Sequence, residues 1–351
     1  MTQASQSSGR PLLTIAIPTY NRSGFLAQLL EILAPQLAGE SRVELIISDN
    51  ASPDDTPEVV ASFREKGLAL IYRRNETNIG PDANFLQCFE QARGEYLWLF
   101  GDDDIILPGG IRNILALLEA EDYGLVYISA YEFRRSYIAE RTSDRFRRFA
   151  EILPDGLQLV KRAGTMITFI SSIIINRDYY FTVPHQKASD FVGTYLIQLS
   201  WICPILADSS KNLFVWERLV AGRGGNSGGW DACQVFGINL KQISYATLGN
   251  RKDIANELCN RTLQSWFPGT IIGIRRGTGS PLDSENMREV LEPVYKKSWR
   301  YWIYVYPVIV LPLVMAQVWY SITRFIDRVM RVIHSIPNLV FSRRSYIKEP
   351  K

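Results

Sequence analysis

The stretch YLWLFGDDD, residues 96–104, joins a run of large apolar side chains to a glycine and three consecutive carboxylates. The apolar part has the length and composition of a buried strand. The acidic part, Asp102-Asp103-Asp104, then falls at the carboxyl end of that strand, where open α/β sheets bind ligands. Three adjacent carboxylates repel one another unless a positive charge shares the site. A divalent cation such as Mg²⁺ or Mn²⁺ that holds a diphosphate meets this need, and a solvated acidic turn is the alternative.

Short apolar segments alternate with amphipathic ones along the first part of the chain. The pattern predicts strands at 12–18, 43–48, 68–73 and 96–100 and later at 124–131, 169–176 and 213–220, and helices from 23 onward, at 57–66, 82–93, 110–120 and 190–205 and over most of 231–265. Such alternation is typical of βαβ units and predicts an α/β fold with a mostly parallel sheet flanked by helices. Because right-handed crossovers place every strand-to-helix loop at one edge, Asp49, the loop at 78–80 and the acidic run should converge.

Composition narrows the class of protein further. The chain has 351 residues, of which 46% are apolar, so it can bury a sizeable core. The four cysteines have neither metal-site nor redox-motif spacing, and we expect free thiols in a reducing compartment. Two histidines in the whole chain argue against a histidine-ligated zinc site. Residues 1–11 are polar and lack an apolar signal core, so we expect a disordered tail and no secretion.

The C-terminal part differs from the rest in charge. Residues 293–351 hold ten Lys or Arg and two Asp or Glu, whereas the remainder holds 29 basic and 34 acidic residues. This distribution predicts contact with an anionic membrane surface and no nucleic-acid partner. The segment 301–323 lacks formal charge over 23 residues, yet contains two prolines and has basic residues on both sides. Symmetric basic flanks favour a helix lying on the membrane over one that spans it, and a buried core helix is the remaining alternative.

Four short motifs follow one another at the predicted strand ends. They are IPTYNR at 17–22, LIISDNAS at 45–52, NIG at 78–80 and GDDD at 101–104. Together they resemble family 2 inverting glycosyltransferases with the GT-A fold, over about the first 110 residues. The GDDD form and a later RGGNS element at 223–227 look most like the abequosyltransferase-like branch, which builds bacterial surface polysaccharides. The Gln-X-X-Arg-Trp element of processive synthases is absent, which favours the addition of a single sugar.

The resemblance implies a role for each matching position. The nucleotide of the donor would be bound by Pro18, Thr19, Tyr20, Asn21, Asp49, Asn78, Gly80, Asp102 and Asp103. Asp104 would bind Mg²⁺ or Mn²⁺ directly, and Asp102 would contact the ribose or support the metal. A bound cation suits this chemistry because it stabilises the negative charge that develops on a diphosphate leaving group.

An inverting transfer also needs a base that takes the proton from the acceptor hydroxyl. The family places an acidic residue roughly ninety positions after the acidic motif, which makes Asp190 the candidate here and His185 the reserve. A helix N-cap is the alternative role for Asp190. The loop at 223–230 supplies candidates for contact with the diphosphate or the acceptor, namely Arg223, Asn226, Ser227 and Trp230, although a plain glycine-rich surface loop fits equally well.

The expected protein is a metal-dependent glycosyltransferase that uses a nucleotide-diphosphate sugar and a lipid-linked glycan acceptor. Its expected parts are a catalytic domain at 12–250, a helical accessory segment at 251–292 and membrane-associating helices at 293–351. Such an enzyme would lie on the cytoplasmic face of a bacterial inner membrane. A sugar nucleotidyltransferase is a competing interpretation, but the loop at 18–22 lacks the glycine-rich, basic phosphate loop it requires. A catalytically inactive, membrane-anchored binding protein is the third.

Overall fold

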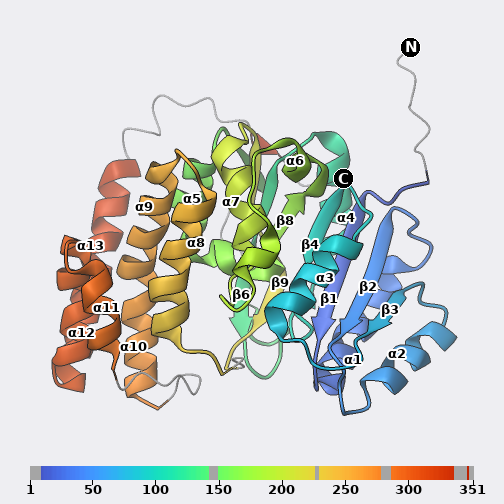
Figure 1. The fold of residues 1–351 in the computed structure, drawn as a ribbon, viewed down its shortest axis with the longest axis horizontal. Coiled ribbons are helices and arrows are strands. Elements are labelled where there is room, and N and C mark those ends of the chain that lie inside the picture. The colour runs from blue at the N-terminus through green and yellow to red at the C-terminus, as the bar shows by residue number, and fades with distance from the viewer. Residues whose placement is uncertain (1–8, 142–148, 226–228, 278–285, 336–345, 348–351) are drawn as a thin grey trace.

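The computed structural model describes residues 9–141, 149–225, 229–277, 286–335 and 346–347. The strands are β1 Leu13–Thr19, β2 Val43–Asp49, β3 Ile71–Arg74, β4 Tyr96–Leu99, β5 Ile105–Ile106, β6 Leu125–Phe133, β7 Ala150–Leu153, β8 Ile173–Asn176, β9 Asn212–Arg223 and β10 Tyr346–Ile347. Within the described residues these ten strands form one sheet in the order β10-β7-β9-β6-β8-β4-β1-β2-β3, and β5 pairs with β9 (Figure 1). The expected α/β fold is therefore confirmed.

The α-helices are α1 Ser23–Leu37, α2 Thr56–Glu65, α3 Pro81–Gln91, α4 Gly110–Ala120, α5 Gly156–Ala163, α6 Arg177–Thr182, α7 Leu199–Asp208, α8 Leu240–Thr247, α9 Lys252–Arg261, α10 Phe267–Arg275, α11 Met287–Tyr295, α12 Tyr306–Val310 and α13 Leu313–Ser335. Short turns of other helix types join them: η1 Gly164–Thr168, η2 Ile170–Ser172, η3 Ala188–Phe191, η4 Cys233–Asn239, η5 Thr262–Trp266 and η6 Tyr301–Val305. Helices lie against the sheet, and α11–α13 extend beyond it (Figure 1).

The first four strands form the parallel part of the sheet that βαβ alternation predicts. β1 pairs in parallel with both β2 and β4, and β2 pairs in parallel with β3. Their carboxyl ends therefore meet at one edge. Backbone bonds tie the loops there: the Asn50 N–H donates to the Thr19 carbonyl at 2.9 Å, and the Asn75 N–H donates to the Asp49 carbonyl at 2.8 Å.

The expectation of a mostly parallel sheet is wrong, because the sheet is mixed. In the described part of the chain, four strand pairs are parallel and five are antiparallel. β8 enters between β4 and β6 and runs against both, while β5 and β7 run against β9. These added strands are only two to four residues long, so they carry little periodicity for a sequence reading to detect.

The helix expected from residue 190 begins only at Leu199. The intervening chain turns twice through the left-handed region, at Gly193 with φ 93° and at Tyr195 with φ 59°, which a continuous helix excludes. The strand expected at 169–176 is likewise shorter and starts at Ile173, after two 3₁₀ turns.

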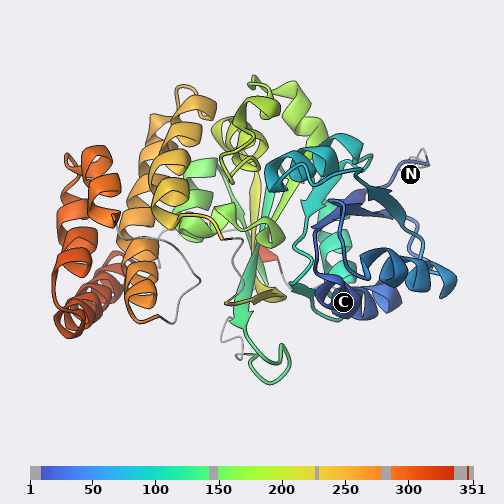
Figure 2. The ribbon, with the colours of Figure 1, turned by 60° about the horizontal axis from the view of Figure 1, so that its bottom comes forward.

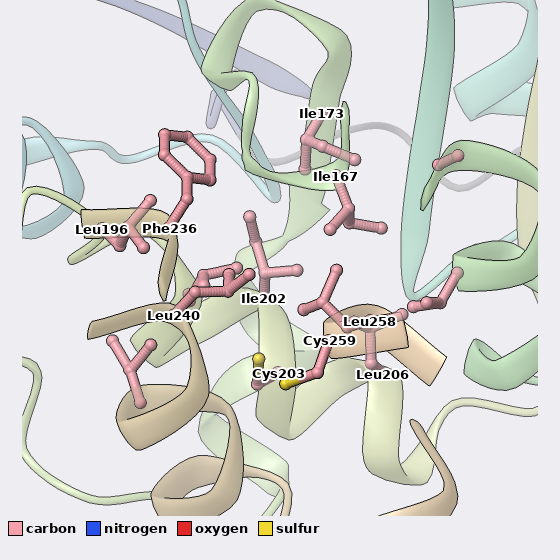
Figure 3. Packing of buried hydrophobic residues seen from close by; sticks show 14 of the residues in the cluster. Ile167, Ile173, Leu196, Ile202, Cys203, Leu206, Phe236, Leu240, Leu258 and Cys259 are labelled. Atoms are coloured by element: carbon pink, nitrogen blue, oxygen red, sulfur yellow. The ribbon is translucent and has the colours of Figure 1, made fainter. Parts of the chain in front are cut away.

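One hydrophobic core runs from the sheet into the C-terminal helices. Figure 3 shows Leu206 of α7 beside Leu258 of α9 and Ile202 of α7 near Leu240 of α8, and Ile173 of β8 belongs to the same cluster. The same cluster of buried side chains continues to Ala316 of α13. The four cysteines are buried and unpaired, as their spacing predicts. The divisions at 250/251 and 292/293 stay predictions.

The segment 301–323 does not form one helix. η6 and α12 end at Val310, the chain is extended at Leu311, and α13 starts at Leu313. Both views place α11–α13 at the end of the molecule away from β1–β3 (Figures 1 and 2). No helix among the described residues is both long enough and apolar enough to cross a membrane.

Replacing Gly156 by alanine should destabilise the protein, because the added Cβ would lie 2.1 Å from the backbone oxygen of Leu206 where α5 meets α7. We expect a loss of about 2–3 kcal/mol in the free energy of unfolding. Gly24 of α1 has no atom within 4 Å of its Cβ position and is the matched control. Gly24→Ala should raise stability by up to about 1 kcal/mol in urea titration. Equal stability of the two variants would contradict this packing.

Candidate active site

A cavity of about 600 Å³ opens at the carboxyl edge of β1, β2 and β4. One group of lining residues comes from the N-terminal strand ends and includes Pro18, Thr19, Tyr20, Asn78, Asp102 and Asp103. A second group comes from residues 166–266 and is rich in apolar and aromatic side chains: Met166, Phe169, Tyr195, Trp230, Phe236 and Trp266. The cavity thus joins a polar, acidic region to an aromatic one.

Asp102 lies in the cavity lining but is only 3% exposed. The Thr19 hydroxyl donates to its Oδ2 at 2.7 Å, and Nη1 of Arg22 donates to its Oδ1 at 3.1 Å. Burial nevertheless raises the pKa of Asp102 to about 6, because the Arg22 charge and these hydrogen bonds do not fully compensate for lost hydration. The carboxylate is therefore held in an environment that still favours additional positive charge.

Asp104 is buried just behind the cavity and is not among its lining residues. The Ser171 hydroxyl donates to its Oδ2 at 2.5 Å, and the backbone N–H of Arg223 donates to its Oδ1 at 2.8 Å. Burial, followed by repulsion from Asp103, raises the pKa of Asp104 well above the ordinary aspartate value. Both oxygens thus already accept a bond from the protein.

Arg22 supplies the positive charge that the acidic run requires. Its Nη1 lies 3.1 Å from Asp102 Oδ1 and 3.7 Å from Asp103 Oδ2, and its side chain is 30% exposed to the cavity side. Arg22 belongs to the motif at 17–22, but no role of its own was predicted for it. The pairing was not detectable because the two segments are 80 residues apart.

The loop after β2 is built by Asp49 and Asn50. Asp49 is fully buried; it accepts a bond from the Ser52 N–H at 2.8 Å and another from the Tyr72 hydroxyl at 2.6 Å. Asn50 lines the cavity and donates to Asn78 Oδ1 at 2.8 Å, so it holds the loop at 78–80 in place. Asp49 shapes the pocket from behind, and the nucleotide contact implied for it stays a prediction.

Strained backbone gathers around this cavity. Among the described residues, the non-glycine residues with positive φ are Asn21 at 55°, Ala51 at 63° and Tyr195 at 59°. Each lies in a loop that contributes to the lining, and Gly80 at the start of α3 has φ 86°. Such conformations cost energy and cluster at functional sites, so they support a binding role for these loops.

The structure does not bring Asp190 to the cavity. Its side chain is exposed in η3 and is absent from the lining. His185 is also exposed, and its Nδ1 lies 2.8 Å from the Val183 carbonyl. The lining carboxylates of the described chain are Asp82, Asp102 and Asp103.

Asp82 is a lining residue that the sequence did not single out. It is 4% exposed, and its Oδ2 accepts bonds from the Gly193 and Tyr195 N–H groups at 2.8 Å each. Burial raises the pKa of its carboxyl group, an effect that these backbone bonds oppose. In the neighbouring sequence, the polar character of Asp82 on α3 is the one feature that points to a role. Its hydrogen-bond partners lie more than 110 residues away in the chain.

Arg223 lies behind the acidic turn, outside the cavity lining. Its guanidinium group sits over the rings of Phe25 and Phe133, and its Nε donates to the Asp103 carbonyl at 3.2 Å. These contacts support the turn, and a diphosphate contact stays a prediction. Trp230 does line the cavity, whereas Asn226 and Ser227 lie outside the described residues.

A cavity at the carboxyl ends of parallel strands is where α/β enzymes bind their ligands, and the comparisons with known proteins identify the family. The family described as glycosyl transferase family 2 matches residues 14–182. The abequosyltransferase RfbV of Salmonella typhimurium is 30% identical over 252 residues, which cover 68% of this chain and 74% of that protein. The chain belongs to glycosyltransferase family 2. The resemblance to this family and to its abequosyltransferase-like branch is confirmed.

Two further similarities are informative. A Campylobacter jejuni protein named GalNAc(5)-diNAcBac-PP-undecaprenol beta-1,3-glucosyltransferase is 24% identical over 188 residues, covering 53% of this chain and 60% of that one. The structure of Staphylococcus aureus TarS 1–349 in complex with UDP-GlcNAc has a TM-score of 0.58 and 17% identity, covering 89% of this chain and 88% of that one. The latter supports the GT-A arrangement of the fold.

Replacing Asp104 by asparagine should raise the melting temperature in neutral and mildly alkaline buffer. The folded pKa of Asp104 lies above the ordinary value of 3.8, so the fold favours the protonated group and the carboxylate costs stability as the pH rises. The amide keeps an oxygen for the Arg223 N–H and offers an N–H to Ser171. We expect a gain of roughly 2–4 °C that shrinks as the pH falls toward the ordinary value. Exposed Asp190→Asn should leave the melting temperature unchanged, and a lower melting temperature for the Asp104 variant would contradict the prediction.

Proposed function

We propose that this glycosyltransferase moves one sugar, with inversion, from a nucleoside-diphosphate sugar to a hydroxyl group of a lipid-linked glycan during synthesis of a bacterial surface polysaccharide such as O-antigen, capsule or exopolysaccharide. The observation that carries the proposal is that a buried acidic turn and an aromatic group line one cavity of about 600 Å³. Such a volume is ordinary for a small-ligand site. The relatives add support, since one is named for an undecaprenol-linked acceptor and TarS is seen with UDP-GlcNAc.

The donor side is the region around Thr19, Asn50 and Asn78. Backbone and amide groups of this region lie beside the acidic turn, where they suit a base and ribose. Asp102 would face the ribose from its place between Thr19 and Arg22. Arg22 is the lining residue whose charge matches a diphosphate.

The acidic turn fits a divalent cation that is held jointly with a diphosphate. In the described part of the chain, no cluster of three or more His, Cys, Asp or Glu is arranged as a complete metal cage. Mg²⁺ commonly uses one or two carboxylates together with substrate phosphates, and Asp102 and Asp103 face the cavity. Direct binding by Asp104, which the family resemblance implies, would use the second lone pair of an oxygen that already accepts the Ser171 or Arg223 bond. When bound, such a cation would neutralise charge on the departing diphosphate.

The acceptor side of the cavity is the part lined by Trp230, Phe236 and Trp266. Phe236 stacks on Trp266 with ring centroids 4.0 Å apart, and Trp230 lies 5.3 Å from Phe236. Flat apolar faces of this kind suit the C–H faces of sugar rings. We therefore place the acceptor glycan against Trp230 and Trp266.

The base of the reaction has two candidates. Asp190 has the sequence spacing expected of the family. Asp82 lines the cavity and so lies where an acceptor could reach it. The buried environment raises the pKa of Asp82, which makes its carboxylate a stronger base than an ordinary aspartate. We favour Asp82 on this geometry.

A sugar nucleotidyltransferase remains the competing function. The loop at 18–22 passes directly into α1 and contains no glycine, so it lacks the flexible phosphate loop that this chemistry uses. Release of pyrophosphate from a nucleoside triphosphate and a sugar phosphate would identify that activity.

The first test is a titration of the purified chain with UDP, CDP, GDP and dTDP, with and without Mn²⁺. We expect one nucleotide to bind more tightly with Mn²⁺, and Asp102→Asn to weaken that binding about tenfold or more because a buried charge-assisted contact is lost. Asp103→Asn and Asp104→Asn distinguish which carboxylate carries the metal effect, and Asp190→Asn is the exposed control. Absence of metal-enhanced binding for every nucleotide would sink the proposed donor site.

The second test compares Asp82→Asn with Asp190→Asn. We expect Asp82→Asn to lower kcat by about 10²–10⁴-fold and to abolish the acidic limb of the pH profile, while the nucleotide affinity stays the same. Asp190→Asn should retain activity, since its carboxylate is exposed outside the cavity. The reverse pattern would assign the base to Asp190, and a loss of nucleotide affinity in Asp82→Asn would indicate that Asp82 only holds the loop at 193–195.

A further inference from the structure

Helix α13 turns its apolar side chains outward. Val314 is 71% exposed and Phe325 is 66% exposed, and the exposed set also holds Met315, Val318, Trp319, Ile322, Ile326 and Val329. These positions recur every three or four residues and so form one stripe along the helix. A helix on the surface of a soluble domain shows the opposite arrangement, with its apolar stripe toward the core.

The side of α13 that faces the protein is small or polar. Ala316 and Thr323 are buried there, and Asp327 is partly buried. Asp327 Oδ1 accepts a bond from the Tyr304 hydroxyl and another from Gln264 Nε2, both at 2.8 Å. Specific polar contacts therefore fix the rotation of α13, and the outward direction of its apolar stripe is a built feature.

The exposed apolar surface continues onto the neighbouring turns. Trp302 and Ile303 of η6 are each 41% exposed, and Val310 of α12 is 44% exposed. The Trp319 indole N–H donates to the Ile303 carbonyl at 2.7 Å, which places η6 directly beside α13. We call the exposed apolar side chains of η6, α12 and residues 314–329 of α13 the α13 surface. Tryptophans that pair an apolar body with a polar tip favour the boundary between lipid and water.

Charge identifies the occupant. Lys296, Lys297 and Arg328 are exposed and Arg300 and Arg324 are half-buried around this surface. The exposed residues of α13 between 314 and 330 include no Asp or Glu. A symmetric contact between two copies would bring these like charges together, whereas an anionic lipid surface would neutralise them.

We propose that the α13 surface lies in the headgroup region of an anionic lipid bilayer, with the axis of α13 along the membrane plane. The apolar stripe enters the boundary of the acyl chains and the flanking cations contact lipid phosphates. This proposal does not depend on the transfer reaction, but it places the protein where a lipid-linked acceptor is found. Placement on the cytoplasmic leaflet of the inner membrane, in contrast, rests on the proposed function, through its nucleotide-sugar donor.

η5 joins this surface to the cavity. Gln264 of η5 bonds Asp327 of α13, and Trp266 of the same turn lines the cavity. A glycan that emerges from the bilayer at α13 would therefore reach the aromatic group first, while the end formed by β1–β3 lies on the far side of the molecule (Figures 1 and 2).

Sedimentation of the full chain with vesicles tests the proposal. We expect binding to phosphatidylcholine vesicles that contain phosphatidylglycerol, weaker binding to phosphatidylcholine alone, and release at high salt. The triple variant Val318→Ser, Ile322→Ser, Phe325→Ser should lower the bound fraction about tenfold or more, because each residue is over 45% exposed and contributes apolar area. Arg324→Glu with Arg328→Glu should remove the preference for phosphatidylglycerol.

Ile138→Ser is the matched control, because Ile138 is 70% exposed in the segment between β6 and β7 and lies outside the α13 surface. It should bind vesicles like the unaltered chain. Melting temperature and nucleotide binding in solution, measured for every variant, separate failure of this surface from failure of the donor site. Equal vesicle binding by the triple variant and the unaltered chain overturns the proposal. A dimer that the triple variant converts to a monomer, without vesicle binding by either, also overturns it and assigns the surface to a second copy.

Discussion

The constraint on which this molecule depends is the burial of Asp102 and Asp104 at the end of β4, with the partly exposed Asp103 between them. Gly101 opens the turn because a Cβ there would lie 2.9 Å from Asp104 Oδ2. β1 and its loop supply Thr19 and Arg22 to Asp102, while η2 and β9 supply donors to Asp104. The raised pKa values of both carboxyl groups show that these partners do not fully replace water. Distant elements are thus held together around a site that favours additional positive charge, which supports the proposed cation–diphosphate ligand.

The sequence predicted the first half of the fold well because its information is local. β1, β2 and β3 are each followed by a helix that leads to the next strand, so periodicity and crossover handedness determine both the elements and the edge where their loops meet. β5, β7 and β8 are two to four residues long and pair antiparallel with strands far away in the chain. Such pairing depends on tertiary packing that a single sequence does not encode in any short window, and the prediction of a mostly parallel sheet failed there.

The candidate site was also predicted in part from local sequence and missed in part. Thr19, Asn78 and Asp102 were predicted to be together because each sits at a parallel strand end, and the cavity contains all three. The family resemblance implied a base at Asp190, which is exposed in η3 and does not line the cavity, so this role stays a prediction. The carboxylate that does face the cavity there, Asp82, arrives from α3 and bonds the backbone of the loop at 193–195. The contacts of Asp82 with residues 193–195 join distant parts of the chain, so no short sequence pattern predicts them.

In the C-terminal helix α13, apolar side chains face outward and small or polar side chains face the protein, which is the opposite of the usual arrangement. From the sequence, apolar residues with basic flanks indicated a membrane surface, a span or a buried core helix, and only the rotation of α13 separates these. Asp327 is the one acidic residue of the described α13, and it turns inward to Tyr304 and Gln264. These two hydrogen bonds from η5 and η6 fix the rotation of α13 about its axis. Asp327 is thus the side chain of α13 that keeps the apolar stripe outward. Through its bond to Gln264 of η5 it also joins α13 to the turn whose Trp266 lines the cavity.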